Sequence, residues 1–175
     1  ATGDLCMEGK KISNSTIING IALGFSVSFL ISSLVAAIYT GELGSILHGW
    51  YLIMTSPSPL VTDYLEIGGL PSAINAGACG MACWLFMVGL KGDSRPSTLA
   101  GYFLVVAHCF YGLNFLTMWP CFLAPFLYLR LKKLNFKNNL HVCMFTTSFS
   151  PFIGELLFRY TQDTFVFGHP TLTVS

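Results

Sequence analysis

Charged side chains are scarce in this sequence. Asp, Glu, Lys and Arg make up 10% of the 175 residues, and hydrophobic residues make up 53%. Soluble domains carry about 25% charged residues, so a soluble fold of this composition would have difficulty covering its surface with polar groups. The basic residues form no run with interleaved aromatic residues, and the formal net charge is +1. The composition therefore argues against a nucleic-acid partner.

Catalytic and metal-binding motifs are also missing. The sequence has no HExxH and no GxSxG motif, and no serine or cysteine nucleophile with an obvious paired histidine, so we expect neither an enzyme nor a cofactor. Six cysteines are present, none of them in a CxxC pair. Cys79 and Cys83 would share a helical face that could bind a soft metal, but no second cluster supports such a site. Cysteines in apolar stretches usually behave as small buried hydrophobes.

Long apolar segments are the main feature that the sequence does have. Residues 17–40 and 70–90 are each long enough to cross a hydrocarbon core of about 30 Å, which takes about 20 residues. Two further apolar segments, 99–129 and 140–160, contain prolines. We therefore predict an all-α protein, a polytopic membrane helix bundle with broken or re-entrant helices. The predicted parts are a polar N-terminal leader (1–16), a transmembrane domain (17–160) and a C-terminal tail (161–175).

Two segments have lengths that do not fit ordinary spans. Residues 42–54 would give a helix of roughly 18 Å, which suits a re-entrant or interfacial half-helix. Residues 99–129 would give roughly 47 Å, whereas two crossings need about 60 Å. We expect this segment to enter the membrane and return as a hairpin, with its tip near Gly112, Asn114 and Pro120. Basic residues flank the hairpin, so the positive-inside rule places its ends and the N-terminus in the cytoplasm.

Polar, proline-containing stretches interrupt the apolar segments at two places. Pro57 and Pro59 prevent regular helix within TSPSPLVTDYLEIGG, residues 55–69. Such backbone is costly in hydrocarbon unless protein or a water-filled cavity surrounds it. Residues 147–155 repeat the pattern T-S-x-S-P, two apolar residues, any residue and an acid. Chance is one explanation of this echo. The other is a pair of broken helices, which indicates a binding site near the middle of the membrane.

The candidate site residues come from these stretches and from polar residues near them. Asp63 and Glu155 would carry a coupling proton or sodium ion, and hydroxyls would bind the solute. Alternatively both acids face water at the interface, and Glu155 is also four residues from Arg159, within reach of a helix ion pair. Asn75 is either a ligand or an inter-helix hydrogen-bond partner. The candidate substrate-binding residues are Ser56, Ser58, Thr62, Asp63, Asn75, Asn114, Ser150 and Glu155.

These features predict a transporter or channel for a small polar solute or ion, surrounded by the lipid bilayer. The alternative is a non-transporting membrane subunit or scaffold that assembles, with a second half or another copy, through small-residue helix faces. Gly20 and Gly24 form a GxxxG pair that would allow a close helix contact. The expected assembly surface is the small-residue face of the helix from Leu70, which consists of Ser72, Ala73, Ala76, Gly77 and Gly80.

Three stretches resemble motifs of the domain-of-unknown-function 1576 family of bacterial integral membrane proteins. They are SPSPLVTDYLEIGGLPSAINAG (56–77), FYGLNFLTMWPCFLAPFLY (110–128) and TTSFSPFIGELLF (146–158), in the family's order. The resemblance covers about residues 43–160. It implies a location in a bacterial-type plasma membrane and this architecture, with the chain as one half of a full-length member or a shortened relative, and brings no catalytic residues. The sequence departs from the family pattern at Pro71, where we expect a small residue, and at 111–113, where the family carries a lysine.

Overall fold

The computed structural model describes residues 13–56, 63–89 and 95–159. All regular structure within these ranges is helical, which confirms the predicted all-α class. In chain order the elements are α1 (Asn14–Thr40), η1 (Leu43–Ser45), α2 (Ile46–Thr55), α3 (Tyr64–Gly68), α4 (Leu70–Gly89), α5 (Pro96–His108), α6 (Met118–Leu131), η2 (Phe136–Asn139), α7 (Leu140–Thr146), η3 (Thr147–Phe149), α8 (Ser150–Gly154) and the π-helical turn η4 (Glu155–Arg159).

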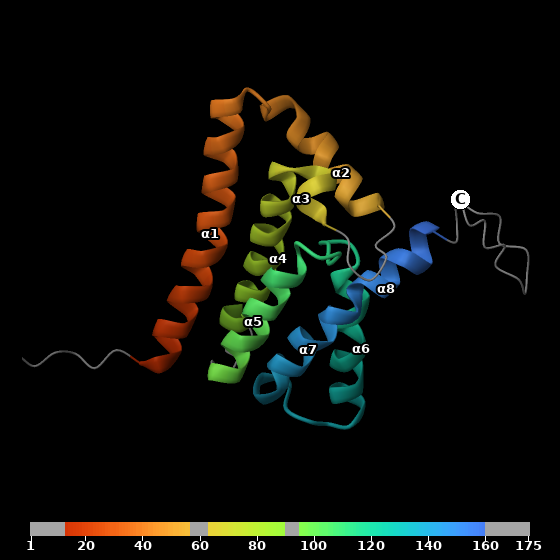
Figure 1. The fold of residues 1–175 in the computed structure, drawn as a ribbon. Coiled ribbons are helices and arrows are strands. Elements are labelled where there is room, and N and C mark those ends of the chain that lie inside the picture. The colour runs from red at the N-terminus through yellow and green to blue at the C-terminus, as the bar shows by residue number, and fades with distance from the viewer. Residues whose placement is uncertain (1–12, 57–62, 90–94, 160–175) are drawn as a thin grey trace, which may run out of the picture.

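Two of these helices, α1 and α4, are long and apolar enough to cross a membrane. They lie side by side (Figure 1), because α4 presents glycines where α1 packs against it. A Cβ atom added at Gly77 would lie 2.7 Å from Leu30, and one added at Gly80 would lie 2.7 Å from Ser26. The small-residue face of α4 is thus occupied within the chain. By contrast, a Cβ atom on Gly20 or Gly24 would meet nothing within 4 Å.

The shorter helices α2, α5 and α6 enter the bundle from its two ends. In Figure 1, α2 starts at the end of the molecule where α1 stops and slants back toward the middle, while α5 enters from the opposite end and α6 returns to it. The helical hairpin predicted for residues 99–129 is therefore present. Its tip is the segment 109–117, in which Gly112 has a φ of 107° that favours glycine. Pro120 lies in the first turn of α6 rather than in the tip, because backbone N–H groups there have no helical partner to lose.

A second proline, Pro125, lies inside α6. It has no N–H to donate to the carbonyl of Cys121 four residues earlier. The Thr146 hydroxyl of α7 lies 2.9 Å from that carbonyl and 2.9 Å from the Cys143 carbonyl of its own helix, so its proton is shared between the two acceptors. A side chain of the neighbouring helix thus satisfies the acceptor that the proline leaves, as apolar surroundings require.

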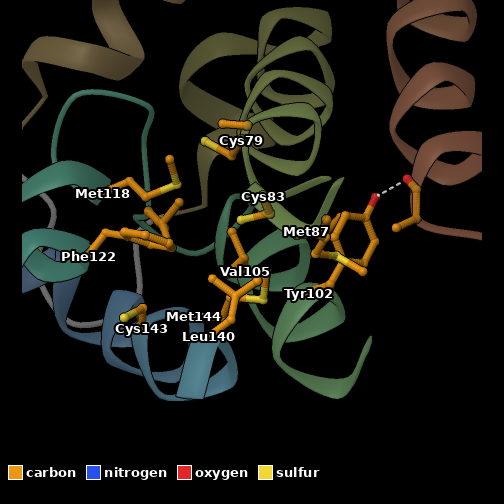
Figure 2. Close-up of a cluster of buried hydrophobic side chains, with 14 of the residues drawn as sticks. Cys79, Cys83, Met87, Tyr102, Val105, Met118, Phe122, Leu140, Cys143 and Met144 are labelled. Carbon is orange, nitrogen blue, oxygen red and sulfur yellow. Dashed lines mark hydrogen bonds between the residues drawn. The ribbon is translucent and has the colours of Figure 1, made fainter. Parts of the chain in front are cut away.

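The buried core is shared by α1, α4, α5, α6 and α7 and is rich in sulfur. Figure 2 shows Cys79, Cys83, Met118 and Met144 among its buried hydrophobic side chains. All five cysteines of the described ranges are free and buried. At the edge of the core, the Tyr102 hydroxyl donates to the Ala22 carbonyl at 2.9 Å and lies 2.7 Å from the Ser26 hydroxyl. This contact joins α5 to α1.

Candidate functional site

The end of α2 and the start of α3 both contact the tip of the α5–α6 hairpin, in the middle of the molecule (Figure 1). The backbone N–H of Tyr64 donates to the Phe110 carbonyl at 3.1 Å. The Asn114 side chain donates to the Ile53 carbonyl, at the end of α2, at 3.2 Å. Elements that enter from opposite ends of the bundle are therefore joined by direct hydrogen bonds.

Asn114 is the residue with the most hydrogen bonds at this meeting point. Its Oδ1 accepts from the backbone N–H groups of Leu116 and Thr117 at 3.0 and 2.9 Å and from the Thr117 hydroxyl at 3.1 Å. These bonds cap the turn that leads into α6. Its Nδ2 donates to the Tyr64 hydroxyl at 3.3 Å, besides the Ile53 carbonyl. Asn114 thus shapes the hairpin tip and ties it to α2 and α3.

Two further side chains fasten the tip to its neighbours. The Asn75 Nδ2 of α4 donates to the Leu113 carbonyl at 2.9 Å, and its Oδ1 accepts from the Phe115 N–H at 3.0 Å. The Tyr64 hydroxyl donates to the Gly112 carbonyl at 3.0 Å. The backbone of the tip therefore has side-chain partners from both α3 and α4, as irregular backbone inside an apolar bundle requires.

The interrupted helix α7–α8 reaches the same point. The Ser150 hydroxyl, at the start of α8, lies 2.5 Å from the Thr117 hydroxyl. The second T-S-x-S-P stretch is thus tied to the hairpin tip through Ser150, and Ile53 and Tyr64, which flank the first stretch, are bonded to the same tip. We call the five side chains that meet here the junction: Tyr64, Asn75, Asn114, Thr117 and Ser150. Each is at most 1% exposed to solvent.

Three other predicted site residues, Ser56, Asp63 and Glu155, lie outside the junction. Asp63 is exposed and caps α3, accepting from the N–H groups of Leu65 and Glu66 at 2.9 and 3.4 Å. Ser56 is half-buried at the end of α2 and donates to the Leu52 carbonyl. Glu155 is half-buried at the start of η4. Ser58 and Thr62 fall outside the described residues.

The residues brought together offer hydroxyl and amide groups. No group of three or more His, Cys, Asp or Glu side chains within the described ranges is placed to hold a metal ion. Asn75, Asn114 and Ser150 are the predicted site residues that lie in the junction, and Tyr64 and Thr117 are not among the predicted residues. The spacing Asn114-x-x-Thr117 is the available signal for the second of these, since an Asn side chain commonly caps the N–H three residues later.

Comparison with curated proteins found no match, and comparison with solved structures found none either. The family model described as a protein of unknown function (DUF1576) matches residues 42–171. This range includes α2, the junction and the repeated T-S-x-S-P pattern. The chain therefore belongs to the DUF1576 family, as its three motifs predict.

Proposed function

We propose that the chain is an integral membrane transporter or channel subunit for a small polar solute or ion, with its site beside the junction. The observation that carries the proposal is the meeting of two half-length elements, entering from opposite ends, at hydrogen-bonded tips. Broken and re-entrant helices place irregular backbone at the depth where transporters bind their substrates. Such backbone is tolerated there when protein or a water-filled cavity surrounds it.

The exposure of α1 supports the membrane location. Only 22% of its most apolar 18-residue window is buried inside the chain, although that window has a mean hydropathy of 2.3. Ile31, Val35 and Ile38 are each more than half exposed. A soluble protein rarely leaves a contiguous apolar surface of this extent in water, whereas the acyl chains of a bilayer would cover it.

The distribution of charge supports an orientation with the N-terminus in the cytoplasm. Arg95 precedes α5, Arg130 lies in the last turn of α6, and Lys132, Lys133 and Lys137 follow it in the connection to α7. Figure 1 places these connections at the end of the molecule where α1 begins. Cytoplasmic loops carry an excess of Lys and Arg, so this end is the cytoplasmic one in our proposal.

Asp63 is the carboxylate that we assign to the transported or coupling cation, H⁺ or Na⁺. It is exposed, and it directly precedes Tyr64 of the junction. Carboxylates at membrane depth commonly mark ion pathways. Its role as the cap of α3 provides a clean test, since Asn caps a helix as well as Asp does but carries no charge.

The test is flux into proteoliposomes that contain the 175-residue chain. Uptake of a sodium tracer, proton movement reported by an enclosed pH dye, and swelling with urea or glycerol would each be measured. We expect at least one flux above that of protein-free vesicles. If it is a cation flux, Asp63→Asn lowers it at least tenfold while leaving the melting temperature unchanged.

The matched variant Asp63→Ala separates the charge from the cap. It loses both, so we expect the same loss of cation flux together with a loss of stability of about 1 kcal/mol. No flux of any probe above protein-free vesicles would overturn the transport proposal. Full cation flux in Asp63→Asn would overturn the role of Asp63.

The alternative is a non-transporting subunit that assembles through a small-residue helix face. The open positions at Gly20 and Gly24 on α1 favour it, since a Cβ atom there would meet nothing within 4 Å. The face of α4 is already used against α1. If a second copy or a fixed partner co-purifies with the chain, Gly20→Ile should abolish that association. Unchanged size and composition of the purified particle would contradict this alternative.

A further inference from the structure

A long apolar groove runs along α4 on the side shared with α1 and α6. It is a hollow of about 660 Å³ whose described lining is entirely apolar, from Leu30 of α1 through Ala78, Leu85 and Gly89 of α4 to Phe115 and Trp119. A smaller hollow of about 220 Å³ shares Phe86 and Trp119 and continues along α6 to Phe126. We call the two together the α4–α6 groove. The proposed transport site does not use it.

The length of the groove matches one leaflet of a bilayer. Its lining residues on α4 extend from Ala78 to Gly89, which is about 16 Å of helix. Half of a hydrocarbon core of about 30 Å is about 15 Å. Gly89 is the last residue of α4, at the end that our orientation places in the cytoplasm. The groove would therefore span the cytoplasmic leaflet from its surface to about the middle of the membrane.

A basic residue, Arg130, lies one helical turn beyond the part of α6 that lines the groove. Trp119, Leu123 and Phe126 line it at spacings of four and three residues, so they follow one face of α6. Arg130 continues that face four residues further on, and it is exposed in the last turn of α6. An acyl chain lying in the groove would thus place a phosphate-bearing headgroup beside a guanidinium.

From the length of the groove and the position of Arg130 we propose that the α4–α6 groove binds one anionic phospholipid of the cytoplasmic leaflet. Its acyl chain fills the groove, and its phosphate pairs with Arg130. The apolar lining excludes water, and a basic residue at the cytoplasmic end of a groove between helices selects anionic headgroups. The proposal rests on the membrane placement above but not on transport, so a negative flux assay leaves it standing.

The test uses tryptophan quenching by phospholipids that carry bromine on their acyl chains. Trp50→Phe and Trp84→Phe leave Trp119 as the only tryptophan, and it lines both hollows. The variant chain is reconstituted in phosphatidylcholine with a few mole per cent of brominated phosphatidylglycerol or brominated phosphatidylcholine. We expect half-maximal quenching at about fivefold less phosphatidylglycerol, since one basic residue near the surface contributes about 1 kcal/mol.

Two matched variants locate the headgroup. Arg130→Gln should make the two brominated lipids equivalent. Lys137→Gln removes an exposed charge in η2, off the groove-lining face of α6, and should retain the fivefold difference. Equal quenching in the parent chain would mean ordinary boundary lipid and would overturn the proposal. Absence of quenching by either lipid would mean that protein fills the groove and would overturn it as well.

Native mass spectrometry of the unmodified chain provides a second measurement in case the tryptophan variants fail to fold. A bound phosphatidylglycerol should survive detergent removal more often than phosphatidylcholine does. Arg130→Gln should reduce that retention about fivefold. Equal retention of the two lipids by the unmodified chain would contradict an anionic-lipid site.

Discussion

At the scale of single residues, a side chain of a neighbouring helix supplies the hydrogen bond that Pro125 removes from α6. The Cys121 carbonyl in α6 lacks its helical donor because the residue four positions on is Pro125, and Thr146 donates instead. Thr146→Val should therefore lower the free energy of unfolding by about 1–2 kcal/mol, since it leaves a carbonyl unpaired in apolar surroundings. Denaturation of the purified chain in mixed detergent micelles measures the change. Thr146→Ser keeps the hydroxyl and should cost much less, so an equal loss in both variants would contradict this role.

The contact between Tyr64 and Asn114 can be tested as a pair. The Asn114 side chain donates to the Tyr64 hydroxyl, which itself donates to Gly112. In a double-mutant cycle of Tyr64→Phe and Asn114→Ala, we expect a coupling free energy of about 0.5–3 kcal/mol, as for residues in one hydrogen-bond network. Ser28→Ala on the exposed side of α1 is the control partner for Asn114→Ala, and that pair should be additive. Additivity of Tyr64→Phe with Asn114→Ala would mean that the junction does not act as a unit.

At the scale of helices, the closeness of α1 and α4 depends on glycine. A Cβ atom on Gly80 would lie 2.7 Å from the Ser26 hydroxyl and 3.0 Å from that of Tyr102, and these two hydroxyls bond each other. Gly80→Ala should therefore destabilise the chain by about 1–3 kcal/mol through overpacking. Gly20→Ala is the matched control, because nothing lies within 4 Å of its added Cβ atom. It should stabilise the chain by about 0.5–1 kcal/mol. A similar effect of both substitutions on the melting temperature would contradict the close packing at Gly80.

The lengths of the apolar segments predicted the hairpin, but the residue types did not predict which side chains meet in the junction. The hairpin of residues 99–129 follows from a segment too long for one span and too short for two, which is a local property. The partners of Asn114 do not follow in this way, because Ile53 lies 61 residues away and only tertiary packing brings it near. Asp63 shows a different limit. An acid in a broken segment suggests an ion ligand, but an Asp before a helical turn is also a good cap, and its described hydrogen bonds are those of a cap.

At the scale of the whole molecule, the positions of the basic residues and the lengths of the helices indicate the same orientation in the membrane. Arg95, Arg130 and Lys137 lie at the start of α5, at the end of α6 and in η2. The start of α5 and the end of α6 are at one end of the molecule, and the half-length helices stop near its middle (Figure 1). Cysteines placed at Ser45, between α1 and α2, and at Asn138, before α7, should therefore react from opposite sides of the membrane. Labelling of intact cells and of inverted vesicles with an impermeant maleimide would show this. Labelling of both positions from one side would contradict the proposed orientation.

The central claim of the transport proposal is that a water-accessible site lies beside the junction, at the end of α2 and at membrane depth. Ser56→Cys, in a chain with Cys6→Ser, tests it most directly, because the five described cysteines are buried. In sealed vesicles a charged thiosulfonate should modify Ser56→Cys rapidly. It should leave Leu85→Cys unmodified, since Leu85 is 57% exposed on the apolar face of α4 that we place against lipid. The account would be contradicted if the reagent, added from either side of the membrane, modified Ser56→Cys no faster than Leu85→Cys.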